Sequence, residues 1–273
     1  MNIIATKSSA VRSNGNTAAQ VAKQIEIILD DSKGITEGLA LGPTARSMDG
    51  AAVRDMIIAV QQKNPQFELI VVISSSGMQI ARTSGNLANR GDRMYFKEAI
   101  KGNNFLTDAY ISAFTNALCV TISTPIKDSN EVTIGVMALD ISLQALKGIA
   151  DNVKVGKNGY IEIVDNVGTV ISHPNNGKLL KKENLTHLEH VQKAINRQSG
   201  WVEALSTRGD KTITAFTPIA KYKWGIIVNQ LEEEIFDVAV SAAHIMIAIL
   251  IIRRLPCAQS LYILRQWRHQ LKN

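Results

Sequence analysis

The sequence predicts an α+β protein in which a long N-terminal helix is followed by two similar modules, each with a central antiparallel sheet. Three observations support this prediction: a helical spacing of apolar residues near the N-terminus, hairpin-like strand pairs, and an internal repeat. The chain has 273 residues, of which 45% are hydrophobic and 20% charged, so it can form two hydrophobic cores. We expect the long helix within residues 1–48 and the modules at 49–152 and 153–234.

The N-terminal helix is predicted from apolar positions that follow a helical period from Ala18 onward. These positions are Val21, Ala22, Ile25, Ile28, Leu29, Ile35 and Leu39. Gly42 and Pro43 end the pattern, and a second helix is expected from Asp49, its N-cap, to the residues before Pro65. The first helix is long and its apolar spacing is close to a heptad, which makes it a candidate surface for a homodimer.

The strands are predicted from short runs rich in β-branched residues and separated by turn residues. The expected strands are 67–74, 78–83, 109–115, 118–125, 132–141, 160–164 and 169–173. A short helix is expected at 93–100 with Asp92 as its N-cap, and another helix is expected to begin at Ser142. The tight turns between neighbouring strands favour antiparallel sheets.

The two modules are expected to be related by an internal duplication. The hairpin at 68–83 resembles the one at 160–174, and the Thr-Pro-Ile segment at 124–142 resembles the one at 217–233. The turn glycines of the two hairpins are 91 positions apart, and the two Thr-Pro-Ile segments are 93 positions apart. Hairpins are common in any sheet, but two markers in nearly the same register favour duplication. The first module has the insert with aromatic residues, so a binding pocket is expected there.

The net charge of +6 does not predict a nucleic-acid partner, because the excess is confined to the C-terminal tail. Five basic residues follow the last acidic residue, Asp237, and they come directly after the apolar segment 238–252. This order predicts a transmembrane helix at 235–254 and a short basic cytoplasmic tail at 255–273. The apolar segment would be about 22 Å long, shorter than a bilayer core of about 30 Å, so a buried core helix is the alternative.

Nothing in the sequence predicts catalysis, a metal or a cofactor. It has no phosphate-binding loop, dinucleotide-binding glycine motif or catalytic-triad order, so an enzyme is not expected. His187 and His190 lack the acidic or thiolate neighbours of a metal site and are expected on a solvated helix surface. Cys119 is expected in the core, and Trp201 and Trp224 are expected to pack against the second sheet.

Several segments resemble, in the same order, the double Cache sensor domain of bacterial chemoreceptors, sensor histidine kinases and related transducers. They are R-x-Y-F at 93–96, TDAYIS, TISTPI, IGVMALDIS, GKNGYIEIVDNVGTVISHP and TPIAKYKWGIIV. The resemblance covers roughly residues 16–236. It implies two PAS-like modules, one distal from and one proximal to the inner membrane, with the sensor outside the cytoplasm and the ligand in the distal module.

An amino-acid-binding subset of this family uses the arginine of an R-x-W-Y motif for the ligand carboxylate and a later aspartate for the ligand ammonium group. Arg93 matches the arginine, Tyr95 and Phe96 stand at the aromatic positions, Tyr110 lies close to the next aromatic, and Asp140 matches the aspartate. Such a site pairs both charges of a zwitterion behind an aromatic wall that excludes water. A structural ion pair is the alternative role for the arginine and the aspartate.

The sequence departs from that subset at Ala88 and Ser112, where the subset has a tyrosine and an acidic residue. Other small carboxylates and amines are therefore candidate ligands beside amino acids. The expected function is extracytoplasmic sensing by a chemoreceptor, and the alternatives are a histidine kinase, a diguanylate cyclase or a soluble small-molecule-binding protein. No output domain follows Ile252, so we expect a truncated or frameshifted gene.

Overall fold

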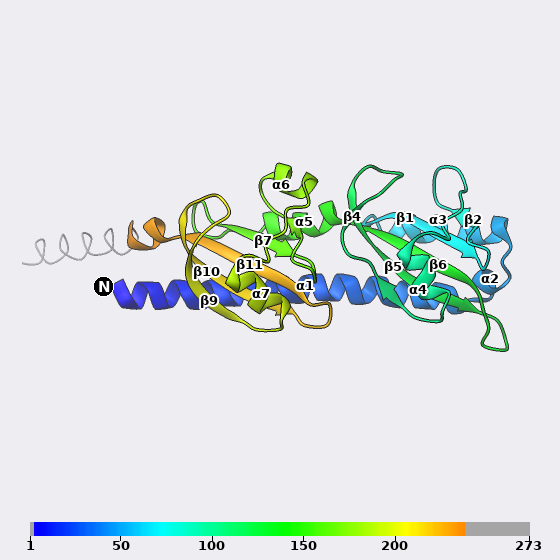
Figure 1. Ribbon diagram of the computed structural model, residues 1–273, viewed down its shortest axis with the longest axis horizontal. Coiled ribbons are helices and arrows are strands. Elements are labelled where there is room, and N and C mark those ends of the chain that lie inside the picture. The colour runs from blue at the N-terminus through cyan, green and yellow to red at the C-terminus, as the bar shows by residue number, and fades with distance from the viewer. Residues whose placement is uncertain (1–2, 238–273) are drawn as a thin grey trace, which may run out of the picture.

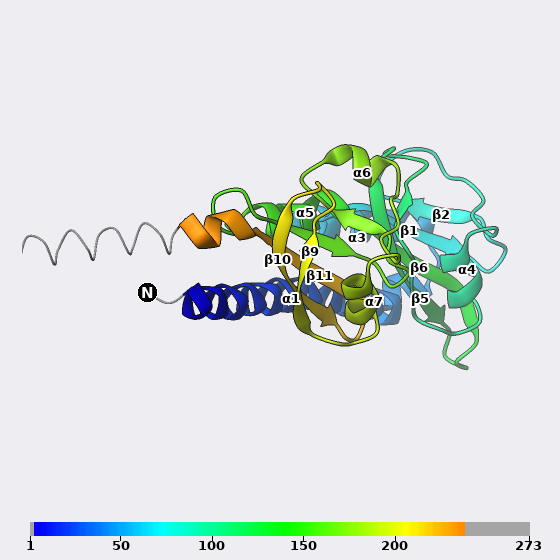
Figure 2. The same cartoon turned by 60° about the vertical axis from the view of Figure 1, so that its left-hand side comes forward.

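The computed structural model describes residues 3–237. A long helix, α1 (Ile3–Leu41), runs along an elongated molecule and packs on two separate antiparallel sheets (Figure 1). The start of α1 and the helical residues 232–237 lie at the same end of the molecule, as the rotated view in Figure 2 also shows. The first sheet is therefore far from both ends of the described chain, whereas the second sheet is close to them.

The first module contains a six-stranded antiparallel sheet with the order β2-β1-β6-β5-β3, in which β4 also pairs with β5. Its strands are β1 (Phe67–Ser74), β2 (Gln79–Arg82), β3 (Phe105–Leu106), β4 (Tyr110–Ile111), β5 (Leu118–Lys127) and β6 (Thr133–Ser142). Its helices are α2 (Pro43–Arg46), α3 (Gly50–Lys63) and α4 (Met94–Ala99). The Asp49 side chain accepts hydrogen bonds from two N–H groups of the first turn of α3, so the expected N-cap is confirmed.

The second module contains a five-stranded sheet with the order β8-β7-β11-β10-β9. Its elements are β7 (Tyr160–Val164), β8 (Val170–Ser172), α6 (Asn176–Leu180), α7 (Glu189–Ile195), β9 (Gly200–Leu205), β10 (Lys211–Ile219) and β11 (Trp224–Leu231). The helix α5 (Leu143–Asp151) follows β6 directly and connects the two modules. Strands that correspond in the internal repeat hold corresponding places in the two sheets, so the α+β architecture with two antiparallel sheets is confirmed.

Helix α1 begins earlier than its apolar periodicity predicts. The predicted pattern starts at Ala18, and the segment 8–15 is rich in serine, asparagine and glycine, which are poor helix formers. The helix nevertheless extends through this segment because it packs against the second sheet, where Lys7 forms an ion pair with Glu203 of β9. Tertiary contacts therefore outweigh the local preference of these residues.

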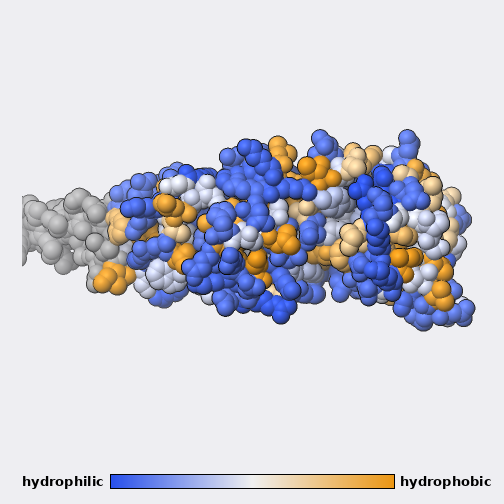
Figure 3. Space-filling model, in the orientation of Figure 1, coloured by the Kyte–Doolittle hydropathy of each residue, from blue (hydrophilic) through white to orange (hydrophobic). Residues whose placement is uncertain are grey.

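The main hydrophobic core lies between α1 and the two sheets, where Ile25 and Leu29 are fully buried. A smaller apolar cluster lies on the opposite face of each sheet, under α4 in the first module and under α7 in the second. Figure 3 shows that hydrophilic side chains cover much of the visible face, with hydrophobic side chains in small groups between them. The face of each sheet that carries α4 or α7 is the face on which polar side chains are also buried.

Two local expectations in the first module are wrong. The N-cap of α4 is Arg93 rather than Asp92, and no side chain caps this helix. The strand expected at 109–115 is reduced to the two residues of β4. It ends there because the Ser112 hydroxyl accepts hydrogen bonds from backbone N–H groups of the next residues, and Asn116 has a positive φ of 54°, which turns the chain.

The second module corrects two further expectations. Trp201 is 46% exposed on the edge strand β9, where the ammonium group of Lys7 lies over its ring, so it does not pack inside the sheet. His190 is 6% exposed on α7 and is not on a solvated surface, because α7 packs on the sheet on this side. Trp224 and Cys119 are buried as expected.

The expected membrane helix at 235–254 and the basic tail at 255–273 lie almost entirely outside the described residues. Within residues 3–237, no helix combines the length and the apolar character needed to cross a bilayer.

Candidate functional site

A small cavity of about 40 Å³ lies on the α4 face of the first sheet. Side chains from β1, β2, β4 and β6 form its base, and residues before α4 and after β4 form its rim. Arg93, Tyr95, Tyr110 and Asp140, four of the five residues expected from the sequence, line this cavity. Phe96 does not; it packs in the apolar cluster between α4 and the sheet. The fold therefore gathers residues that are up to 47 positions apart in the sequence.

Asp140, on β6, is the buried acid of the cavity and is 8% exposed. Its Oδ1 atom accepts hydrogen bonds from the Thr121 hydroxyl at 2.6 Å and from the Tyr110 hydroxyl at 3.3 Å. Burial raises the pKa of Asp140 to about 6, although these two hydrogen bonds oppose the rise. Burial also raises the pKa of Tyr110, so its hydroxyl is a hydrogen-bond donor and carries no charge near neutral pH.

Arg82, at the end of β2, is the buried base of the cavity and is 4% exposed. Its Nε atom donates to the carbonyl of Ser84, and its Nη1 atom donates to the carbonyl of Asn86 at 2.6 Å. Its Nη2 atom is buried and has no hydrogen-bond partner among residues 3–237. Burial lowers the pKa of Arg82, but an arginine stays charged. A fixed guanidinium therefore presents an unused donor in a cavity, which is a costly arrangement unless a ligand accepts it.

Two further guanidinium groups, those of Arg90 and Arg93, line the same cavity. Arg93 is held more loosely than Arg82: its side chain is 42% exposed, and its Nε atom lies 3.6 Å from a carboxylate oxygen of the exposed Asp92. Three guanidinium groups thus face one buried carboxylate, that of Asp140. This imbalance gives the cavity a positive potential and favours a ligand with at least one carboxylate.

The walls of the cavity are partly aromatic. Tyr95 is buried, and burial raises its pKa to about 12. The ring of Phe114 lies over the guanidinium group of Arg82, 4.6 Å from its centre, and forms part of the rim. Gly85 lies against the same ring, and a Cβ atom there would come within 2.5 Å of it. The loop after β4 therefore covers part of the cavity through its contacts with Arg82 and Gly85.

Arg82, the most buried of the three arginines that line the cavity, is not among the residues expected from the sequence. The family motif directs attention to Arg93, whereas Arg82 lies in a short strand and belongs to no motif. A signal was present, because an arginine ends a strand that is otherwise expected to be buried. A buried arginine must be satisfied by several acceptors, and such positions are candidates for anion binding.

Residues 4–239 match the model of the Cache domain family. The match extends over most of the chain, and the chain therefore belongs to this family. Its residues 3–237 form the pair of antiparallel sheets on one long helix that the resemblance implies.

The curated relatives of this chain include several bacterial chemoreceptors. The methyl-accepting chemotaxis protein McpA of Bacillus subtilis (strain 168) is 29% identical over 166 residues, which are 59% of this chain and 23% of McpA. The methyl-accepting chemotaxis protein PscA of Pseudomonas syringae pv. tomato is 26% identical over 166 residues, which are 59% of this chain and 26% of PscA. The matched region thus spans about a quarter of the length of these relatives.

The solved structures with a similar fold are ligand-binding and extracellular domains. The ligand-binding domain of the Pseudomonas fluorescens chemoreceptor CtaA in complex with L-serine has a TM-score of 0.63 and 22% identity, over 80% of this chain and 95% of that one. The extracellular domain of mmHK1S-Z3, described as a histidine kinase, has a TM-score of 0.70 and 16% identity, over 84% of this chain and 97% of that one. These similarities show the fold.

Proposed function

We propose that the first module is the ligand-binding part of a transmembrane signal transducer, in first place a chemoreceptor, and that its ligand is an amino acid. The proposal rests on the presence of two buried groups of opposite charge in the lining of one cavity. These groups are the guanidinium of Arg82, whose Nη2 donor is unused, and the carboxylate of Asp140. A ligand carboxylate would accept from Arg82, with Arg93 closing from the rim, and a ligand ammonium group would pair with Asp140. The serine complex of CtaA supports the same ligand class.

The connection between the modules gives ligand binding a route to the second module. Asp140 lies near the end of β6, and α5 begins at Leu143, directly after that strand. Helix α5 contacts β7 and β8 of the second module as well as α1. A ligand that pulls on Asp140 would therefore favour one of two packings of α5 against the second sheet, and this preference is the coupling that a transducer needs.

The position of the sensor relative to a membrane follows from the family. Chemoreceptors and histidine kinases hold Cache domains outside the cytoplasm, and both classes are among the relatives and neighbours of this chain. Both ends of the described chain lie beyond the second module, which places that module next to the membrane in this proposal. The segment 235–254 would then be the span, and α1 would be the surface for a homodimer.

A thermal-shift screen of the full chain in mild detergent tests the proposal. The panel contains the amino acids, small mono- and dicarboxylates, and small amines at millimolar concentration. A ligand that binds the native state must raise the melting temperature. We expect an increase with at least one amino acid, and we expect it to disappear in Arg82→Ala and in Asp140→Asn. No response to any amino acid, with a response to another class, would reject the ligand while keeping the sensor.

A further inference from the structure

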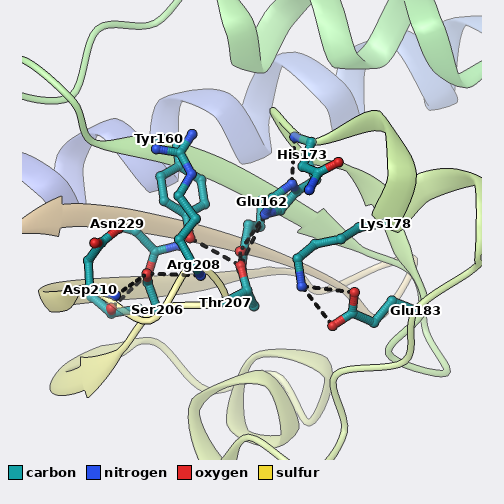
Figure 4. Close-up of polar contacts among 12 residues, drawn as sticks. Tyr160, Glu162, His173, Lys178, Glu183, Ser206, Thr207, Arg208, Asp210 and Asn229 are labelled. Atoms are coloured by element: carbon teal, nitrogen blue, oxygen red, sulfur yellow. Dashed lines mark hydrogen bonds and ion pairs between the residues drawn. The ribbon is translucent and has the colours of Figure 1, made fainter.

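The second module contains a buried acid–histidine pair on the α7 face of its sheet, shown in Figure 4. Glu162 is 1% exposed and His173 is 0% exposed. The His173 Nε2 atom lies 3.3 Å from Glu162 Oε1 and 3.0 Å from the hydroxyl of Thr207, and this hydroxyl donates to the same carboxylate oxygen. The three side chains come from β7, from the end of β8 and from the turn between β9 and β10.

The contacts of His173 define its protonation state. The backbone N–H of Asn175 donates to the Nδ1 atom of His173 at 2.7 Å, so Nδ1 carries no proton. Because the Thr207 hydroxyl uses its proton on Glu162, its oxygen must accept from His173, and the proton of the ring is therefore on Nε2. His173 is thus a neutral imidazole whose two nitrogen atoms are both engaged.

A second proton on the His173 ring can only bind to Nδ1, and this atom already accepts a hydrogen bond from the N–H of Asn175. Protonation of Nδ1 would make it a donor that faces the N–H of Asn175, so this hydrogen bond would be lost and replaced by repulsion. The imidazolium would gain an ion pair with the buried carboxylate of Glu162, which rewards the charged form. The two protonation states therefore favour different positions of the backbone at residue 175.

This backbone position begins a helix at the junction of the two modules. Asn175 is the N-cap of α6, and its side chain accepts from the N–H of Gly177. Leu179 of α6 is buried in the apolar cluster of the second module, and Leu118 of β5 in the first module packs against that cluster. Both leucines line a groove of about 260 Å³ together with residues of α5. A displaced α6 would therefore change the contact between the modules.

We propose that His173 is a proton-operated latch: in its neutral form it holds the start of α6 in place, and on protonation it pairs with Glu162 and releases α6 from the junction of the modules. Histidine is the side chain that ordinarily changes its charge between about pH 5 and 8. The ligand of this second site is thus the proton. Acidification would change the contact between Leu118 of the first module and α6 of the second.

The internal repeat gives this latch a counterpart in the first module. His173 follows Arg82 by 91 positions, the same spacing as the turn glycines; Arg82 is the last residue of β2, and His173 directly follows β8. Asn229 of β11 corresponds to Asp140 of β6, and each accepts a hydrogen bond from a threonine of the neighbouring strand. The place that forms the cavity in the first module is therefore filled in the second by a titratable pair.

The other charged groups near His173 do not take over this role. Lys178 of α6 is paired with Glu183 at 2.8 Å, and the guanidinium group of Arg208, in the turn before β10, lies 4.0 Å from the ring centre of Tyr160. The Tyr160 ring meets the His173 ring edge-on at 5.4 Å.

The groups to consider on α7 are Glu189, His190 and Lys193, and His187 lies just before this helix. Glu189 is paired with Lys193 at 2.7 Å, and His187 is exposed. His190 is buried; burial lowers its pKa, and the charge of Glu162 opposes this. Burial therefore disfavours a charge on His190.

Hydrogen–deuterium exchange of the full chain tests the latch without any ligand. The readout is the protection of residues 174–183 at about pH 7.5 and about pH 5, corrected for the intrinsic pH dependence of exchange. We expect protection of this segment to fall about tenfold or more at the lower pH, while α4 of the first module keeps its protection. Equal protection of residues 174–183 at the two pH values would overturn the proposal.

Three variants identify the group responsible. His173→Asn keeps an acceptor for the N–H of Asn175 and cannot be protonated, so its α6 should stay protected at both pH values. Glu162→Gln removes the carboxylate that rewards protonation, so the response should disappear at about pH 5. His187→Asn, the matched control on the exposed histidine, should respond like the original chain. A response that persists in Glu162→Gln, or in a folded His173→Asn, would overturn the proposal.

Discussion

Lowering the pH from about 7.5 to about 5 is expected to weaken the binding of an amino acid to the first module about tenfold. The ammonium group of the ligand needs the ionised form of Asp140, and burial raises the pKa of this residue to about 6. Nearly every molecule has an ionised Asp140 at the higher pH, whereas about one in ten does at the lower pH. The association constant of the ligand should follow this fraction.

The same pKa predicts how the stability of the ligand-free chain depends on pH. The folded-state pKa of Asp140 lies above the ordinary value of 3.8, so its contribution to stability is fully present below about pH 3.8 and is lost as the pH rises through about 6. A rise of about two pKa units corresponds to about 3 kcal/mol. Relative to Asp140→Asn, the original chain should therefore lose up to about 3 kcal/mol between pH 4 and 7.

Isothermal titration calorimetry at several pH values measures the first effect, and chemical denaturation measures the second. Asp140→Asn is the control in both assays, because its side chain has a similar shape and does not titrate. Affinity for the amino acid should be low and independent of pH in this variant. If the original chain binds its ligand with the same affinity at pH 5 and 7.5, Asp140 does not pair with the ligand and the reasoning is wrong.

The remaining predictions concern single side chains. Arg82→Ala should weaken ligand binding by a factor of about 10 to 150, since a buried charged hydrogen bond is worth about 1.5–3 kcal/mol. Arg93→Ala should weaken it by about tenfold or less, because an exposed charged contact is worth less. Calorimetry with equal losses for the two variants would contradict this ranking. Gly85→Ala should lower the free energy of unfolding by about 1–3 kcal/mol in denaturation experiments, because φ is +79° there and the added Cβ meets the ring of Phe114. Trp224→Ala should cost about 3–5 kcal/mol in the same assay, because Trp224 is 1% exposed; a loss below about 1 kcal/mol would show that its surroundings collapse around the vacancy.

Most of the fold could be predicted from local patterns. The strand Phe67–Ser74 and the helix that starts after Asp49 follow directly from an apolar run and an N-cap. The internal repeat predicted two similar modules, and the two sheets have equivalent strand orders. Patterns of this kind involve only residues that are close together in the sequence, so they can be recognised without the structure.

The missed elements are those that depend on distant contacts. Strand β9 has alternating exposure and an exposed Trp201, and it forms because β10 offers a partner along its edge. Helix α7 lies in a polar insert, and it forms over the apolar cluster that includes Val191. Neither signal is strong in a window of ten residues, since the stabilising partners lie elsewhere in the chain.

The candidate site was predicted in part, for a similar reason. The motif and the resemblance pointed to Arg93, Tyr95, Tyr110 and Asp140, and the structure places these four around one cavity. They could not show which arginine is fixed in the cavity. Arg82 is fixed by hydrogen bonds to carbonyl groups of the loop that follows β2, and these contacts appear only in the folded chain. Whether these residues bind a ligand stays a prediction.

A crystal structure of the chain with the amino acid that stabilises it most tests the central claim most directly. We expect the ligand to lie in the cavity of the first module, with its carboxylate on Nη2 of Arg82 and its ammonium group on the carboxylate of Asp140. The loop that carries Phe114 should have moved to make room, because the cavity of about 40 Å³ is small. A ligand found elsewhere, with Arg82 Nη2 still unpartnered, would show that this cavity is not the binding site.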